Sequence, residues 1–206
     1  MGNVEFATEE RTELAEFLGT LTSAEWDSPS LCEGWRVRDV VAHMISYDGL
    51  GPAGVLRRFV RGRFRPAVVN EIGVQEYSHE PDRLLELLDE RLTPRGFPTW
   101  GDGRIAFLDG LIHHQDIRRG LGKQRDVPAE RLAVALPLSL GAPPLRAKGR
   151  THGLRLIADD IDVALGEGAE VRGPGEALLL AMAGRRGVVD ELTGPGQSVL
   201  AERIGG

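Results

Sequence analysis

The segment from residue 104 to residue 119 places two ionisable side chains, Asp109 and His113, beside a stripe of apolar residues. The apolar residues recur with the spacing of an amphipathic helix, and Gly120 follows as a typical helix end. Residues four apart lie on one face of a helix, so the carboxylate and the imidazole are expected side by side. Ionisable groups are costly to bury unless they are paired or coordinated. The fold must therefore bring a partner to this face.

A second predicted helix, beginning near Arg36, offers that partner. Its apolar stripe has His43 at the border, where a side chain can face a bundle interior and still reach a cavity. Two imidazoles and one carboxylate leave coordination positions open, as catalytic metal sites do. A metal-free interpretation also remains open: Asp109 could orient a neutral imidazole or pair with an arginine, and His43 could be a hydrogen-bonded core residue.

Helical patterns continue through most of the chain, whereas the C-terminal part changes character. After two adjacent prolines the sequence predicts short strands over residues 153–160, 161–166 and 170–172, with helices over 176–183 and 198–204. We therefore expect a mainly α protein, with a helical bundle over residues 1–148 and a small α/β domain over 149–206. Residues 51–80 have a weaker helical pattern.

Composition narrows the classes of partner. The net charge is −6, which argues against nucleic acid as a general partner. The longest apolar stretch, around residues 132–145, contains three prolines and is too short to span a bilayer. The N-terminus lacks the features of a signal peptide, so we expect a soluble, cytoplasmic protein without membrane partners. The local basic run is expected to be solvated, and it comprises Arg57, Arg58, Arg61, Arg63 and Arg65.

One long motif resembles a known family. The run 29–43, PSLCEGWRVRDVVAH, is similar to the LCxGWxVRDVVAH signature of the mycothiol-dependent maleylpyruvate isomerase family, within the DinB-like superfamily. Residues 113–122 resemble the second signature of this family, and residues 171–185 resemble its C-terminal part. The resemblance covers most of the chain and is weak between about residues 50 and 100.

The resemblance implies a DinB-like four-helix bundle that holds a divalent metal, most often Zn²⁺. Its ligands would fall on His43, Asp109 and His113. The family often has glutamate where this chain has the shorter Asp109, so ligand reach and metal identity are open. The co-substrate would be mycothiol, a small-molecule thiol. A metal-activated thiolate would add to a small electrophile, giving isomerisation when the thiol leaves or net S-transfer when it stays.

Other residues near the motifs have weaker assignments. Asp116 is either an acceptor that orients a ligand imidazole or an ordinary surface carboxylate. Arg118 and Arg119 suit the C-terminal end of a helix, or alternatively bind an anionic substrate. His114 points away from Asp109 and is expected to be exposed and outside the site. The single cysteine, Cys32, excludes an internal disulfide and is expected to be a buried, inert thiol.

Three rival functions use the same ligands. A zinc-water hydrolase needs a general base, and the chain has no HExxH motif. An iron(II) facial triad normally lies on a β-barrel, which conflicts with a helical body. A non-enzymatic bundle could hold metal for stability or sensing. The sequence leaves open whether the protein is a monomer or a homodimer.

Overall fold

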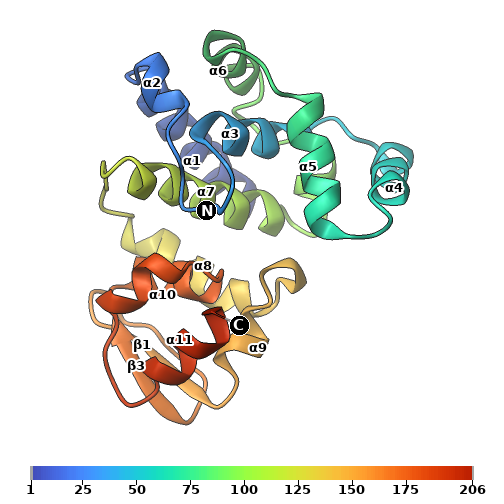
Figure 1. The fold of residues 1–206 in the computed structure, drawn as a ribbon. Helices are drawn as coiled ribbons and strands as arrows, with labels where there is room; N and C mark the ends of the chain where they lie inside the picture. Colours follow the sequence, from blue (N-terminus) through green and yellow to red (C-terminus); the bar gives the residue numbers. More distant parts are fainter. Residues whose placement is uncertain (1, 206) are drawn as a thin grey trace. The chain divides into compact units, whose positions relative to one another are not determined.

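A computed structural model describes residues 2–205, and the chain divides into two compact units. Unit 1 is Met1–Gln124 and unit 2 is Arg125–Gly206 (Figure 1). Among the described residues, no helix is long and apolar enough to cross a membrane.

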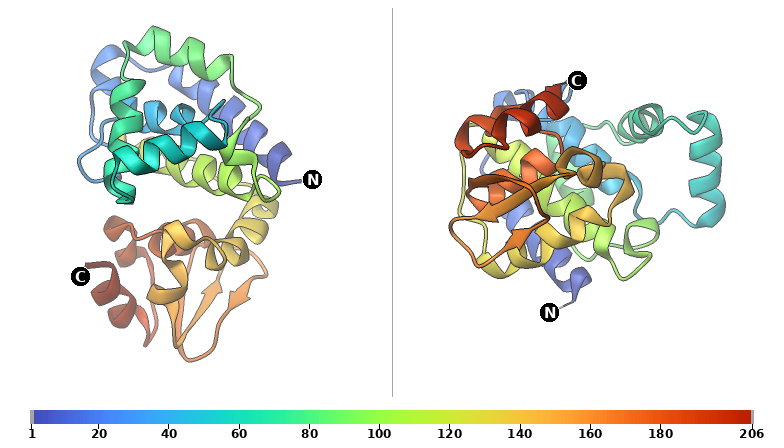
Figure 2. Two further views of the ribbon diagram at one scale, coloured as in Figure 1. Left: turned by 90° about the vertical axis from the view of Figure 1, so that its right-hand side faces the viewer. Right: turned by 90° about the horizontal axis from the view of Figure 1, so that it is seen from below.

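Unit 1 consists of helices. They are α1 (Asn3–Leu18), α2 (Ser23–Trp26), α3 (Val37–Ser46), α4 (Pro52–Arg61), α5 (Pro66–Glu76), α6 (Pro81–Asp89), the 3-10 helix η1 (Phe97–Thr99) and α7 (Arg104–Gly120). Helices α1, α3, α6 and α7 pack against one another as the expected four-helix bundle. Helix α5 packs on α3, and α4 packs on α5, so this pair extends from the side of the bundle (Figure 2).

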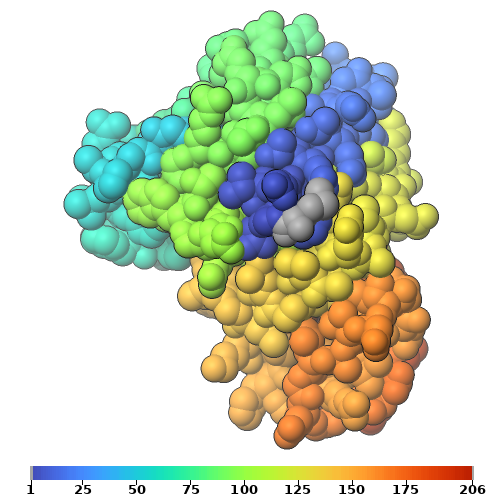
Figure 3. All heavy atoms as spheres, turned by 180° about the vertical axis from the view of Figure 1, so that it is seen from behind, coloured from blue at the N-terminus to red at the C-terminus, as the bar shows by residue number. Residues whose placement is uncertain are grey.

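Local sequence signals explain where several of these helices begin. A proline occupies the first turn of α4, α5 and α6. The backbone N–H that proline lacks would have no hydrogen-bond acceptor within the helix at this position. Helix α2 starts with the predicted capping box, because the Thr22 side chain accepts from the Glu25 amide and the Glu25 carboxylate accepts from the Thr22 amide. The N-terminal end of α1 lies against the N-terminal end of α7 (Figure 3).

The core of unit 1 lies between α1, α3, α6 and α7. Its side chains are fully buried apolar groups contributed by all four helices, including Leu14, Leu18, Val40, Val41, Ile45, Leu84, Leu88 and Ile117. Burying an aliphatic side chain of this size contributes about 1.5–3 kcal/mol. This packing holds α3 beside α7 and so positions the side chains that project from both helices.

Unit 2 combines helices with a small sheet, as expected. Its elements are α8 (Ala129–Leu140), η2 (Pro143–Leu145), α9 (Ala147–Thr151), β1 (Leu154–Ala158), β2 (Ala164–Leu165), β3 (Ala169–Gly173), α10 (Gly175–Met182), η3 (Arg186–Glu191) and α11 (Gln197–Gly205). The strand order is β2-β1-β3, with β1 antiparallel to β2 and parallel to β3. The apolar helix α10 is buried along most of its length.

The boundary between the units lies earlier than the boundary after residue 148 that we expected. Helix α8 packs against α10 and belongs to unit 2, so the division falls between Gln124 and Arg125. The apolar stripe of α8 includes the buried Leu132 and Leu136. Such a stripe predicts that the helix is covered, but it does not identify the element that covers it.

Candidate metal centre

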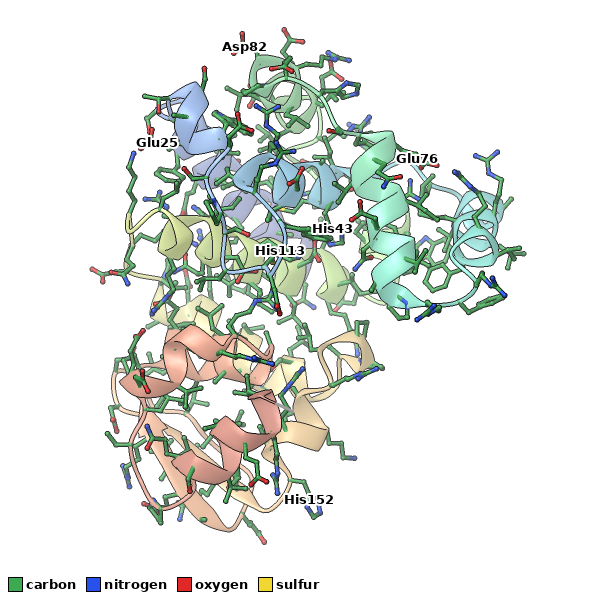
Figure 4. All side chains as sticks on the ribbon, in the orientation of Figure 1. Glu25, His43, Glu76, Asp82, His113 and His152 are labelled. Carbon is green, nitrogen blue, oxygen red and sulfur yellow. The ribbon has the colours of Figure 1, made fainter. Side chains whose placement is uncertain are left out.

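Helices α3 and α7 bring three side chains together, one from α3 and two from α7. The Nε2 atoms of His43 and His113 each lie 3.4 Å from Oδ1 of Asp109. The possible ligand atoms of the three residues all lie within 4.8 Å of one another. Figure 4 labels His43 and His113 close together in unit 1, and their ring centroids lie 5.0 Å apart. The residues predicted from two distant segments therefore form one cluster.

Each helix fixes its own part of this cluster. Helix α7 presents Asp109 and His113 one turn apart. Arg36 is the N-cap of helix α3, and its amide donates to the Asp39 carboxylate over 3.0 Å. The helix places His43 about two turns further along. The Trp35 ring, just before α3, lies 5.0 Å from the His43 ring between centroids and 6.4 Å from the His113 ring. The indole therefore covers one side of the pair.

The cluster is mostly shielded from water and strongly coupled. His43 and His113 are buried, while Asp109 is half-buried. Burial by itself would raise the pKa of Asp109, but the adjacent His113 and His43 imidazoles hold that pKa well below its usual range. Burial would lower the pKa of His113, yet the Cys32 sulfur, the Asp109 charge and hydrogen bonds to Asp109 and Asp116 together raise it. Without a cation, the structure favours an ionised carboxylate beside a protonated imidazole.

The donor set matches what a divalent cation requires. Two imidazole nitrogens and one carboxylate oxygen converge from a buried surface, and three protein ligands leave a position for an exogenous group. The residues present therefore fit a metal such as zinc, and His43, Asp109 and His113 would hold it.

Asp116 forms a hydrogen bond with one of the two imidazoles. Its Oδ2 lies 2.9 Å from Nδ1 of His113, and the carboxylate is fully buried. A carboxylate accepts hydrogen bonds, so Nδ1 carries the proton and Nε2 is directed towards Asp109. Nδ1 of His43, by contrast, is buried without a hydrogen-bond partner among the described residues. The orienting role anticipated for Asp116 has the required geometry.

Cys32 lies much closer to this network than expected. Its Sγ donates to Oδ2 of Asp116 over 3.0 Å and lies 3.5 Å from Nδ1 of His113. Cys32 is half-buried rather than fully buried as we expected, and its inertness stays a prediction. The motif itself contained the signal, because Cys32 and His43 belong to the same run of sequence. What the sequence did not indicate is that the loop folds back onto α7.

The loop that carries Cys32 is fixed to α7. The amide of Leu31 donates to the Asp116 carbonyl over 3.0 Å, and Pro29 and Arg36 form an isolated antiparallel bridge. The loop passes so close to Gly120 that a Cβ added there would lie 2.7 Å from the Pro29 carbonyl oxygen. Glycine at this position therefore allows the loop to lie on the helix.

The structure contradicts the prediction that His114 is exposed. Its side chain is fully buried, and Nδ1 lies 3.1 Å from Oε2 of Glu10, a buried residue of α1. Nε of Arg118 donates to Nε2 of His114 over 3.1 Å. The prediction failed because α7 is buried on two faces. Its apolar stripe is covered, and α1 also covers the face that carries His114. His114 nevertheless points away from Asp109, as expected.

The two arginines proposed for substrate lie at the end of α7. The Arg118 guanidinium lies 3.8 Å from the centroid of the Phe17 ring, on the His114 side of the helix. Arg119 is half-buried. The Arg118 guanidinium also donates to the Lys123 carbonyl, over 3.5 Å, just beyond the end of α7. The role of either arginine in binding a substrate stays a prediction.

Arg58 departs from the solvated basic run predicted around it. The other four arginines of that run are exposed, whereas Arg58 is buried. It donates to the Ser46 hydroxyl over 3.1 Å and to Glu76 over 2.9 Å, and its guanidinium lies 4.9 Å from the Tyr47 ring centroid. Burial raises the pKa of Tyr47 to about 12. Tyr47 in turn packs edge-on against His43, so Arg58 supports the wall of the site.

A pocket of about 350 Å³ borders the site through Trp35. Its lining is largely polar and includes Arg36, Asp39, Glu71 and Gln75 from α3, its N-cap and α5. The indole of Trp35 therefore contacts both the pocket and the two imidazoles.

Comparisons with known proteins place this architecture in a class of helical bundles that carry a small α/β unit. Residues 7–96, which lie within unit 1, match the mycothiol maleylpyruvate isomerase N-terminal domain. Crystal structures of a mycothiol-dependent maleylpyruvate isomerase and of its histidine-to-alanine variant each align with a TM-score of 0.63 and 18% sequence identity. Each alignment covers 95% of this chain and 92% of the other. No curated protein matches the chain. The fold is that of the isomerase.

Proposed function

We propose that the protein is a metal-dependent enzyme that uses a small-molecule thiol, mycothiol, to isomerise a small electrophile or to transfer sulfur to it. The convergence of His43, Asp109 and His113 on one point carries the proposal. The domain family of residues 7–96 and the fold shared with a mycothiol-dependent maleylpyruvate isomerase support the choice of thiol. The site of action would be the cytoplasm.

The residues around the cluster would support this chemistry in distinct ways. When bound, a divalent metal such as Zn²⁺ would favour the thiolate form of the co-substrate. Asp109 would supply an ionised carboxylate oxygen as the third ligand. Asp116 would keep Nε2 of His113 free of a proton by holding the proton on Nδ1. Trp35 would limit the access of water. No protein nucleophile is required, since the thiol comes from the co-substrate.

Elemental analysis of the purified protein tests the site directly. We expect about one equivalent of zinc per chain in the wild type and a large loss in His43→Ala, because two protein ligands rarely retain the ion. The control is His79→Ala, which removes an exposed histidine of unit 1. Equal zinc content in His43→Ala and His79→Ala would overturn the metal assignment.

A cobalt(II)-substituted sample separates the thiol enzyme from its rivals. Addition of the thiol should change the visible spectrum, and His113→Ala should abolish that change because it removes a ligand. A hydrolase would instead turn over an ester or amide without any thiol. A binding bundle would do neither, and removing its metal would change only the melting temperature.

A further inference from the structure

A second group of metal-ligating atoms lies on the opposite edge of the His113 ring. It consists of Sγ of Cys32, Nδ1 of His113 and Oδ2 of Asp116. The sulfur lies 3.5 Å from the nitrogen and 3.0 Å from the oxygen, and the nitrogen lies 2.9 Å from the oxygen. Ligands of one tetrahedral ion lie about 3.3–3.8 Å apart, given metal bonds of roughly 2.0–2.3 Å. The separation between sulfur and nitrogen falls in this range, and the two separations to Asp116 fall short of it by only about 0.3–0.4 Å, so a small movement of the Asp116 carboxylate completes a coordination triangle.

We propose that Cys32, His113 and Asp116 form a second, alternative site that captures a thiophilic cation such as Cd²⁺ or Cu⁺. A thiolate ligand selects soft cations, whereas the first group, with two imidazoles and a carboxylate, has no sulfur. The inference rests on the proposed function in one respect, namely that the first group is the working metal site. Capture at the second site would then inhibit the enzyme.

The position of Cys32 makes the site both accessible and preformed. The thiol is half-buried, so a cation can reach it from solvent, while Asp116 is fully buried behind it. The Leu31 amide fixes the loop to the Asp116 carbonyl, and the Ser30 hydroxyl accepts from the Cys32 amide over 3.1 Å. The sulfur is therefore held in place before any ion arrives.

The two sites compete because they share one imidazole. On capture, the S–H bond of Cys32 breaks, its proton leaves to water and a sulfur–metal bond forms. The proton on Nδ1 of His113 also leaves to water while Nε2 keeps its proton, and the freed lone pair on Nδ1 binds the cation. A neutral imidazole has one lone pair for a metal, so Nε2 can no longer serve the first site. Occupation of one site therefore excludes the other.

Cadmium titration of the metal-free, full-length protein tests this inference. The wild type should develop a near-ultraviolet thiolate-to-cadmium absorption band that saturates at about one equivalent. His43→Ala should keep the band, because it leaves all three ligands of the second site intact. Cys32→Ser should lose the band, and His113→Ala should bind cadmium roughly tenfold or more weakly. His79→Ala should match the wild type, and circular dichroism verifies that each variant is folded.

The outcomes distinguish this inference from the proposed function. A wild-type protein that shows no band, or a His113→Ala band with unchanged affinity, would overturn the second site. Zinc retention by His43→Ala would overturn the first site without affecting the cadmium result. In zinc-loaded protein, cadmium should release zinc as the thiolate band grows. Band growth with zinc still bound would refute the competition between the sites.

Discussion

A buried ion pair between α1 and the end of α3 gives a quantitative test of how the bundle holds the site together. Nη1 of Arg11 lies 2.5 Å from Oδ2 of Asp48, and the two side chains are only 2% and 3% exposed. The same guanidinium donates to the Arg91 carbonyl over 2.7 Å. Burial raises the pKa of Asp48 even though Arg11 acts to lower it. The attraction between the partners therefore does not fully offset the loss of hydration.

Removing one partner should be far more damaging than removing both. Arg11→Met leaves a carboxylate buried without its cation, which typically costs about 3–5 kcal/mol. That is a large part of the roughly 5–15 kcal/mol by which a domain is stable. The double variant Arg11→Met/Asp48→Leu replaces the pair with apolar groups, a change that is often neutral. We therefore expect the double variant to be more stable than either single variant.

Urea denaturation followed by tryptophan fluorescence measures this effect in the relevant unit. Trp26, Trp35 and Trp100 are the only tryptophans of the chain, and all lie in unit 1. With a urea m-value of about 2 kcal/mol/M, Arg11→Met should lower the midpoint by about 2 M. The control is Arg83→Ala, which removes a surface pair whose partners are 49% and 64% exposed and should change stability by less than about 1 kcal/mol. The buried pair lacks the expected effect if Arg11→Met lowers stability as little as Arg83→Ala does, or if the double variant is no more stable than the single variants.

Three further predictions concern the site and its supports. Asp116→Asn should weaken zinc affinity about 10- to 100-fold, because it disturbs the hydrogen bond that orients His113; competition with a chromophoric chelator measures this, and an unchanged affinity would contradict the orienting role. The Lys123 hydrogen bond lowers the pKa of Glu25 to about 2, so Lys123→Ala should raise that pKa towards 4.5 in an NMR titration. Since the folded-state pKa is lowered, the Glu25 contribution is present at neutral pH and is lost as the pH falls towards about 2. Gly120→Ala should displace the loop that lies on it and destabilise unit 1 by about 1–3 kcal/mol in the same urea assay. A more stable Gly120→Ala variant would contradict this close contact, because alanine favours a helix when it meets no steric clash.

Helical periodicity predicted the parts of the site that lie on regular elements. Asp109 and His113 follow from the spacing on one helix, and His43 follows from its place at the border of a second stripe. Periodicity describes the faces of a helix about its own axis. It contains no information on how many of those faces are covered, which is why the burial of His114 against Glu10 was missed.

Non-periodic segments account for the remaining differences. The position of Cys32 depends on a loop that is fixed by backbone hydrogen bonds and by the absence of a side chain at Gly120. Arg58 is buried because α5 places Glu76 beside it, a contact between two helices whose patterns were weak. The family resemblance indicated the three candidate ligands, but it did not indicate these supporting contacts.

The distribution of the three ligands over two helices determines how the cluster can vary. Asp109 and His113 are one turn apart on α7, so their relative position is set by the helical backbone. His43 alone moves with α3. Substitutions that alter the packing between α3 and α7 would thus change a single geometric coordinate, the reach from His43 to the other two ligands. Ion radius, rather than ligand identity, is the property that such distant core substitutions would tune.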